Sequence, residues 1–227
     1  MSNGLLALML DSFWKILLPG LAVTLPLTLI SFVLALVIAV ITALVQYARV
    51  PVARQIARIY IWIVRGTPLL VQLYVIFFGL PKLGVVLDPL PAAVIVFALN
   101  TGAYDAESVR AALEAVPRGQ LEAAECAGLR YPQAIWRIVL PQAMRTAVPS
   151  LGNSLISLVK DTSLAANITV TEMLMVTQRI VARTYEPLVL YIEVGLIYLL
   201  FSTLLTWLQR RVERRLNAYQ KREDGEC

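Results

Sequence analysis

The sequence predicts an all-α integral membrane protein with about five transmembrane helices. Hydrophobic residues make up 59% of the 227 residues and charged residues 15%, whereas soluble domains are roughly 45–50% apolar and about 25% charged. Apolar stretches of about 20 residues, long enough to cross about 30 Å of hydrocarbon, recur along the chain. The basic residues gather at the ends of these stretches and in the loops between them, as they do in multi-pass membrane proteins.

Composition also argues against other classes of protein. The net charge of +5 is not arranged as a basic face interleaved with aromatic residues, so no nucleic-acid partner is expected. Histidine is absent from the sequence, which removes the commonest general base and metal ligand. The two cysteines, Cys126 and Cys227, are too far apart in sequence to suggest a metal cluster and are interpreted as free thiols. A membrane enzyme is therefore a remote hypothesis.

The first elements are a short helix and a long apolar span. Residues 4–16 predict an amphipathic helix on the membrane surface, within an N-terminal interfacial segment at 1–18, and Trp14 suits the headgroup level. Pro19 then opens an uncharged run at 20–45, which we interpret as the first span.

The second and third spans carry polar residues. The second, at 59–80, contains Arg65 followed by Gly-Thr-Pro, and an arginine at depth costs about 2.5–3.5 kcal/mol on insertion scales. Arg65 must therefore face a partner, a cavity or the interface. The third span, at 92–113, is apolar in its first half and polar in its second.

A polar stretch at 122–141 interrupts the apolar pattern. Glu122 to Ala127 predicts a short helix that Gly128 ends, and Pro132 opens the next turn. A helix–glycine–helix elbow this polar is expected outside the lipid, where it could insert into a groove of a partner protein.

Two spans follow the elbow. The stretch at 135–159 contains Pro149 and several polar residues and predicts a broken or kinked fourth span, after which 164–186 is expected to pack on the outer side. The fifth span, at 188–208, ends the membrane domain assigned to 19–209, and 210–227 is interpreted as a charged cytoplasmic tail that is soluble or frayed.

The basic residues predict an orientation with the N-terminus outside and the C-terminus in the cytoplasm. Under the positive-inside rule this arrangement leaves thirteen basic residues inside and four outside, with the elbow on the cytoplasmic side. The inner set is Arg49, Arg54, Arg58, Arg110, Arg118, Arg130, Arg137, Arg210, Arg211, Arg214, Arg215, Lys221 and Arg222, and the outer set is Lys15, Lys82, Arg179 and Arg183.

The elbow resembles the cytoplasmic coupling loop, or EAA loop, of permease subunits in bacterial ATP-binding cassette (ABC) importers. The spacing E-A-A-x3-G-x9-I-x-L-P is matched throughout. The resemblance implies a type I ABC importer permease fold in which residues 118–141 dock on a cytoplasmic ATPase. Two plainer interpretations remain: an Ala-rich loop without a partner, and Glu122 as a charge near a helix N-terminus. The matched positions are Glu122, Ala123, Ala124, Gly128, Ile138, Leu140 and Pro141.

Further stretches resemble permeases for polar amino acids, the histidine, glutamine, glutamate, arginine and cystine importers. The similarity covers roughly residues 15–215. Within this group, the stretches RGTPLLVQL and LVKDTSLA together most resemble L-cystine permeases. The stretches are RGTPLL (65–70), ALNTGAYDAESVR (98–110), RGQLEAAECAG (118–128) and SLVKDTSLA (157–165).

Polar residues within spans are candidates for the translocation path, since a zwitterion needs hydrogen bonds that lipid cannot offer. Asn100, Tyr104 and Glu107 share one helical face, and Gln72 could join them from the second span. The alternative for Asn100 and Tyr104 is interhelical hydrogen bonding alone. The full candidate set is Arg65, Gln72, Asn100, Tyr104, Glu107, Asp161, Thr162 and Ser163.

Asp161 and Arg65 each have a structural alternative. Asp161 follows the fourth span, where a carboxylate beside a helix break suits an ammonium group. It could instead pair with Arg65 or Lys160, or cap the following helix. For Arg65 itself, structural pairing is the favoured interpretation.

The leading hypothesis is one membrane subunit of an importer for a polar amino acid in the bacterial inner membrane. The resemblance implies these partners: ATPase subunits that bind ATP and Mg²⁺, a second permease copy or paralogue, and a periplasmic or lipid-anchored amino-acid-binding protein. This chain has no G-x4-G-K-[ST] phosphate loop, so no cofactor is expected on it. Membrane lipid is expected to surround it as a further partner. The alternative is an ATP-independent secondary transporter or channel, although no internal repeat supports it.

Overall fold

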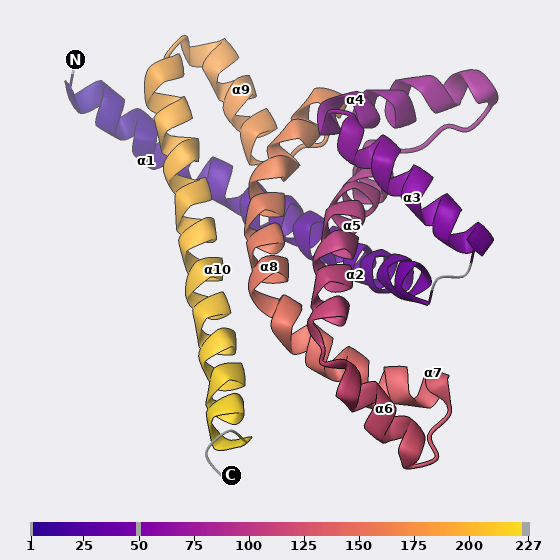
Figure 1. Ribbon diagram of the computed structural model, residues 1–227. Coiled ribbons are helices and arrows are strands. Elements are labelled where there is room, and N and C mark those ends of the chain that lie inside the picture. Colours follow the sequence, from indigo (N-terminus) through magenta and orange to yellow (C-terminus); the bar gives the residue numbers. More distant parts are fainter. Residues whose placement is uncertain (1, 49–50, 224–227) are drawn as a thin grey trace.

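The computed structural model describes residues 2–48 and 51–223, and the side chains of 7–48 and 51–216. All regular structure in these residues is helical (Figure 1). Arg49 and Cys227, and the side chains of Lys221 and Arg222, lie outside the described parts. The α-helices are α1 (Ser2–Pro19), α2 (Leu25–Tyr47), α3 (Pro51–Gly66), α4 (Leu69–Tyr74), α5 (Pro89–Ala115), α6 (Arg118–Cys126), α7 (Tyr131–Ala134), α8 (Leu140–Asp161), α9 (Met173–Thr184) and α10 (Pro187–Glu223).

Shorter turns of other helix types connect several of these helices. The π-helical turns are η1 (Gly20–Thr24), η2 (Val75–Gly79) and η4 (Ile135–Val139), and the 3₁₀ helices are η3 (Leu80–Leu83) and η5 (Thr162–Ile168).

α1 and α2 form one continuous helical path, so the prediction of a separate surface helix at 4–16 was wrong. Pro19 lies inside α1, and the π-helical turn η1 follows it directly. A proline removes one helical hydrogen bond and crowds the preceding turn, and a wider π turn can absorb that distortion without ending the helix. The path from Ala7 to Tyr47 has 41 residues and is about 60 Å long at roughly 1.5 Å per residue.

The second predicted span is sharply bent. α3 begins at Pro51, earlier than the predicted start of the span, and meets the segment 69–83 at an angle of 106°. The break falls at Thr67 and Pro68, because the residue before a proline is disfavoured in the helical region. Pro68 has an extended backbone with ψ of 137°. The bend places Arg65 at the end of α3.

Small residues bring α2 and α5 close together. Ala35, Ala39 and Ala43, one helical turn apart on α2, are fully buried. A Cβ atom added at Gly102 of α5 would lie 3.0 Å from Ile38 Cγ2 and 3.2 Å from the Ala35 carbonyl oxygen. Close packing of this kind holds membrane helices together where the hydrophobic effect is absent.

The fourth span, which was predicted to be broken or kinked, is not broken at Pro149. Pro149 lies inside α8, which continues as an α-helix to Asp161 before η5 begins. α10 likewise continues beyond the predicted end of the fifth span, to Glu223, so the start of the predicted tail is helical.

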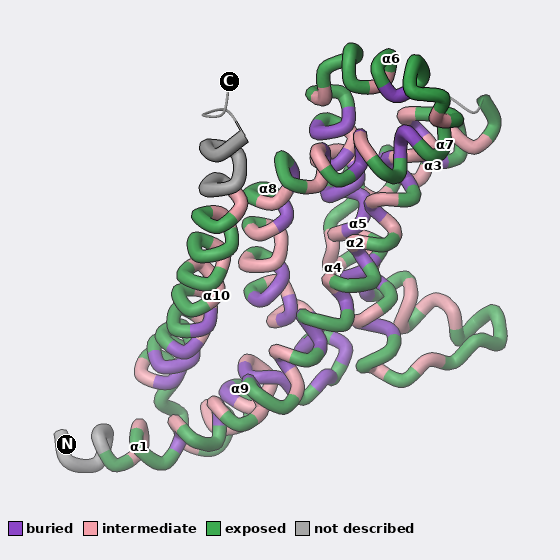
Figure 2. Tube along the Cα trace, turned by 90° about the horizontal axis from the view of Figure 1, so that it is seen from below, coloured by how far each residue is buried: buried purple, intermediate pink, exposed green. Residues whose placement is uncertain are grey.

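The helices define two ends of the molecule. α6 and α7 lie at one end, towards which α10 runs, while α1 begins at the opposite end, where α4 and α9 also lie (Figures 1 and 2). Among the described residues, the paths Ala7–Tyr47 and Pro187–Leu216 are long and apolar enough to cross a membrane, and the bent pair α3–α4 can count as a third. α5 and α8 occupy the positions of the third and fourth predicted spans but do not reach that level of hydropathy.

Candidate functional site

A polar cavity of about 470 Å³ lies between α5 and α8. Leu69 at the start of α4 and Leu164 of η5 complete its wall. Eight of its ten lining residues carry an amide, hydroxyl or carboxyl group, which suits a polar solute inside a membrane protein. The lining residues are Leu69, Asn100, Thr101, Tyr104, Ser150, Asn153, Ser154, Ser157, Asp161 and Leu164.

The structure brings four of the predicted path residues together on the α3–α5 side of this cavity, and a fifth, Asp161, on the α8 side. Asn100 and Tyr104 line it, and Asn100 Nδ2 donates a hydrogen bond of 3.1 Å to Gln72 Oε1. The guanidinium carbon of Arg65 lies 5.1 Å from the centre of the Tyr104 ring, within the range of a cation–π contact. Gln72 and Arg65 therefore support the two lining residues from the side of the α3–α4 bend.

Asp161 lines the same cavity at the last residue of α8. Its carboxylate makes no capping bond to η5 and, among the described residues, no ion pair with Arg65 or Lys160. The structure therefore supports neither alternative proposed for Asp161.

The hydroxyl groups of Thr162 and Ser163 hydrogen-bond to nearby backbone carbonyls. The Thr162 hydroxyl is buried and donates to the Val159 carbonyl at 2.6 Å, and the Ser163 hydroxyl donates to the Lys160 carbonyl at 2.7 Å. Neither is among the described residues that line the cavity.

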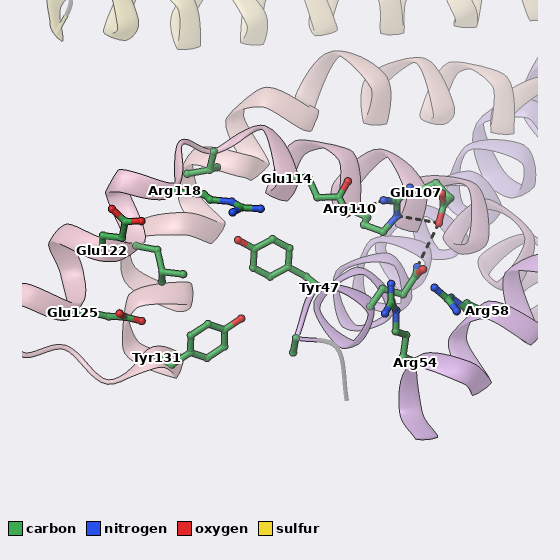
Figure 3. Close-up of a pocket in the computed structure, with 14 residues that line it drawn as sticks. Tyr47, Arg54, Arg58, Glu107, Arg110, Glu114, Arg118, Glu122, Glu125 and Tyr131 are labelled. Carbon is green, nitrogen blue, oxygen red and sulfur yellow. Dashed lines mark hydrogen bonds and ion pairs between the residues drawn. The ribbon is translucent and has the colours of Figure 1, made fainter. Parts of the chain in front are cut away.

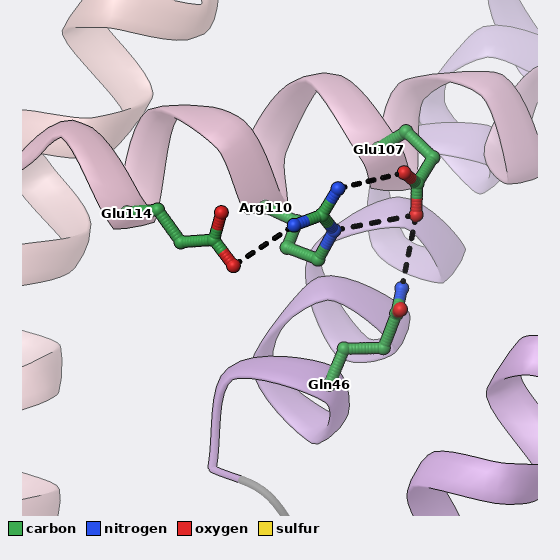
Figure 4. A network of polar contacts seen from close by, with 4 residues as sticks. All are labelled: Gln46, Glu107, Arg110 and Glu114. Carbon is green, nitrogen blue, oxygen red and sulfur yellow. Dashed lines mark hydrogen bonds and ion pairs between the residues drawn. The ribbon is translucent and has the colours of Figure 1, made fainter.

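Glu107 lies in a second, larger cavity of about 1010 Å³, between the end of α2, the start of α3, the second half of α5 and α6 (Figure 3). Arg110 donates to Glu107 at 2.9 Å and to Glu114 at 2.8 Å, and Gln46 of α2 donates to Glu107 at 3.4 Å (Figure 4). Glu107 is thus held in an ion-pair network apart from the α5–α8 cavity.

The sequence reasoning missed four lining residues on α8. They follow one another at helical spacing, and Asp161 continues the same face one turn beyond the last of them. This periodicity is a usable signal. It was overlooked because these residues were interpreted only as interruptions of an apolar span. The four are Ser150, Asn153, Ser154 and Ser157.

The elbow has the predicted helix–glycine–helix form, with an earlier start. α6 begins at Arg118, so Glu122 is not in its first turn, and the interpretation of Glu122 as an N-terminal charge does not hold. Gly128 has a φ of +81° and ends α6. Its N–H donates to the Glu125 carbonyl at 2.9 Å, and the Leu129 N–H donates to the Ala124 carbonyl at 3.0 Å. This pair of bonds is a Schellman motif.

One side of the elbow packs on the protein and the other is exposed. Ala124, Leu140 and Ile135 are buried, which fixes α6 against η4 and the start of α8. Glu122 and Glu125 are exposed along the rim of the larger cavity (Figure 3). Ala123 and Pro141 are exposed as well, and Ile138 is half-buried.

Tyr131 on α7 faces the same cavity (Figure 3). Burial raises the pKa of its phenol, and the neighbouring Tyr47 adds to the rise. The phenol therefore remains protonated at neutral pH and contributes a hydrogen-bond donor, not a charge, to this rim.

A family model matches most of the chain. Residues 35–218 match the family described as "Binding-protein-dependent transport system inner membrane component". The match includes the elbow, the α5–α8 cavity and the larger cavity.

Curated relatives match nearly from end to end. The chain is 46% identical over 210 residues to the L-cystine transport system permease protein TcyB of Bacillus subtilis (strain 168), covering 92% of this chain and 90% of that protein. It is 38% identical over 221 residues to the L-cystine transport system permease protein TcyL of the same organism, covering 94% and 92%.

A solved structure has the same fold. The structure titled "Crystal structure of an amino acid ABC transporter with histidines" superposes with a TM-score of 0.83 at 31% sequence identity, covering 92% of this chain and 97% of that one.

Proposed function

Because the chain belongs to the family of binding-protein-dependent transport system inner membrane components, we propose that it forms the translocation path of an importer for a polar amino acid. L-cystine is the substrate we favour. Transport is driven by ATP hydrolysis on a separate ATPase subunit, and residues 19–209 form the membrane domain. The observation that carries the proposal is the 46% identity to an L-cystine permease over nearly the whole chain.

The α5–α8 cavity is the proposed path. Asp161 offers a carboxylate to an ammonium group, while Asn100 and the serines of α8 offer hydrogen bonds to the other polar groups of an amino acid. Arg65 and Gln72 position Tyr104 and Asn100. Glu107 contributes indirectly, because its hydrogen bond to Gln46 holds α5 to α2 on the elbow side of the path.

The elbow is the proposed coupling element. α6 connects directly to the cavity-lining helices on both sides, to α5 through two residues and to α8 through α7 and η4. A partner that binds the exposed Glu122 and Glu125 could therefore displace α5 and α8, the two walls of the path, when it moves. In this proposal the partner is the ATPase, and its closure alternates access to the cavity.

The remaining partners follow from the same proposal. A second permease copy or paralogue completes the pore, and a periplasmic or lipid-anchored amino-acid-binding protein delivers substrate at the end where α4 and α9 lie. The elbow end faces the cytoplasm, with the N-terminus outside, in the bacterial inner membrane. The excess of basic residues on the elbow side supports this orientation.

Native mass spectrometry of the subunit, extracted from its own membranes in mild detergent, tests the assembly. We expect two permease chains with two copies of a nucleotide-binding protein, and the mass of the second permease distinguishes a homodimer from a heterodimer. A stable oligomer of this chain without an ATPase would instead favour an autonomous carrier or channel.

Uptake measurements test the substrate. Proteoliposomes are prepared with the whole complex and with its binding protein outside. They are expected to accumulate radiolabelled L-cystine only when ATP is enclosed in the lumen, on the side of the ATPases. Accumulation of another amino acid and not of cystine would refute the substrate and leave the importer assignment intact.

A further inference from the structure

A line of polar side chains runs along the contact between α5 and α8, and we call it the polar seam. The two helices contribute residues at the same helical spacing and pair in antiparallel register, since Ser108 bonds Ser150 and the earlier Asp105 bonds the later Ser154. Four residues of the seam also line the α5–α8 cavity, namely Thr101, Ser150, Ser154 and Ser157. The seam consists of Thr101, Asp105 and Ser108 on α5 and Ser150, Ser154 and Ser157 on α8.

Asp105 is the one carboxyl group in this seam, and it is fully buried. The Ser154 hydroxyl donates a hydrogen bond of 2.5 Å to its Oδ1 atom. Its Oδ2 atom has no hydrogen-bond partner, and no Lys or Arg pairs with it, among the described residues. Burying an acid with so little compensation is costly. An intramembrane carboxyl group of this kind is by default a candidate for function.

The bond to Asp105 determines what Ser154 can offer to the cavity. A serine hydroxyl has one hydrogen to donate and two lone pairs to accept with. Since the hydrogen of Ser154 is committed to Asp105, its oxygen can only accept hydrogen bonds from a molecule in the cavity that Ser154 lines.

Asp161 presents a second acceptor on the same face of α8, seven residues further along. Two acceptors on one face select a group rich in N–H donors, and an ammonium group is such a donor. We propose that Asp105 is a positioning residue that holds Ser154 as an acceptor for the ammonium group of the transported amino acid. This inference rests on the proposed amino-acid substrate.

Asp105 acts through Ser154 and does not touch the substrate in this proposal, because it is not among the described residues that line the cavity. Asparagine at this position can still accept from Ser154 through its Oδ1 atom. Leucine, of similar size, cannot, and it would release the Ser154 hydrogen. The comparison of these two variants separates the hydrogen bond from the volume of the side chain.

The test is direct binding to the purified permease–ATPase complex in detergent, without the binding protein, by isothermal titration. The probes are L-cystine and N,N′-diacetyl-L-cystine, which lacks the ammonium groups. The quantity compared is the ratio of the two Kd values, because a general loss of structure changes both Kd values and leaves their ratio unchanged.

We expect the wild-type complex to prefer L-cystine, and Ser154→Ala to reduce that preference about 3- to 10-fold, as expected for one hydrogen bond. Asp105→Leu is expected to reduce it by a similar factor, with no further loss in the double variant. Asp105→Asn should stay within about 2-fold of wild type. Should Asp105→Leu fail to assemble, Asp105→Ala takes its place.

Thr146→Val is the matched control, because it removes a hydroxyl from α8 outside both the seam and the cavity, at nearly constant side-chain size, and that hydroxyl donates to the Gln142 carbonyl of its own helix. It is expected to leave the preference unchanged. A preference that survives Asp105→Leu, or that falls as far in Thr146→Val as in Ser154→Ala, would overturn the positioning role.

A wrong substrate can be distinguished from a wrong role for Asp105. If the wild type binds no L-cystine, the titration is repeated with L-arginine, L-histidine, L-glutamine and L-glutamate and their N-acetyl derivatives. Binding of one of these refutes cystine alone, and the same variants then test Asp105. A wild-type complex that binds none of them overturns this inference as well.

Discussion

Gly128 carries the turn of the elbow through its backbone conformation. Its φ of +81° lies in the left-handed region, and no other atom lies within 4 Å of the position that a Cβ would take. The constraint is therefore conformational and not one of space. A side chain in this region costs roughly 1–2 kcal/mol for most residues and less for asparagine.

We expect Gly128→Ala to weaken co-purification of the ATPase through this backbone strain, while Gly128→Asn retains most of it. Gly128→Arg is expected to abolish it, because the strain is then joined by a long charged side chain on the exposed docking element. The measurement is the ratio of ATPase to permease after affinity purification, with the amount of permease in the membrane as the control for insertion. Full ATPase recovery with Gly128→Arg would contradict the role of the elbow as the docking element.

Residues whose role is set by local chemistry could be predicted from the sequence. Gly128 and Glu122 were found because turn chemistry and motif spacing involve only near neighbours in the chain. Asp105 was not, because its burial depends on which face of α8 packs against it. Glu107 shares a helical face with Tyr104, but the end of α2 borders the cavity of Glu107 and not that of Tyr104. The two residues therefore lie in different cavities.

Helix packing makes its own predictions. Gly102→Ala places a Cβ against Ile38 and the Ala35 carbonyl, and overpacking of a tight contact costs about 1–3 kcal/mol. We expect a lower thermal midpoint for the purified complex, followed by the loss of bound ATPase or by fluorescence. The control is Gly195→Ala in α10, where nothing lies within 4 Å of the added atom. An equal shift in both variants would mean that the α2–α5 contact is looser than described.

The positions of the helices were predictable, but their continuity was not. Thr67-Pro68 ends a helix inside what was predicted as one span, while Pro19 and Pro149 lie within helices. A proline is compatible with a membrane helix when a π turn or a neighbouring side chain accommodates it. η1 follows Pro19. At Pro149, Gln209 of α10 donates to the proline's own carbonyl at 3.1 Å and so ties α10 to α8 beside it. The packing of neighbouring helices is a tertiary feature, so a sequence pattern does not contain it.

For the whole molecule, the orientation can be measured with the native thiol of Cys126, which is exposed on α6. In a Cys227→Ser background, a membrane-impermeant maleimide is expected to label Cys126 in inside-out vesicles and not in right-side-out vesicles. A variant that also carries Cys126→Ser is the control for other reactive groups. Labelling from the outer face would reverse the orientation proposed above.

The number of spans marks the limit of what hydropathy predicts about the whole chain. The apolar paths at 7–47 and 187–216 are evident from composition, and the bent pair α3–α4 can be counted with them. α5 and α8 were predicted as spans from apolar stretches that polar residues interrupt, and those polar residues lower their hydropathy. Helices that line a path are the ones that composition identifies least well.

That same polarity has a consequence for biogenesis. On their own, α5 and α8 would partition poorly into lipid, because α5 carries charged and amide side chains from Asn100 onwards and α8 carries them along its length. They become acceptable only when α2 shields one side of α5 and α10 one side of α8. α2 is synthesised before both, whereas α10 leaves the ribosome last. We therefore expect insertion of this chain to be cooperative, with α8 stable in the bilayer only after α10 has been synthesised.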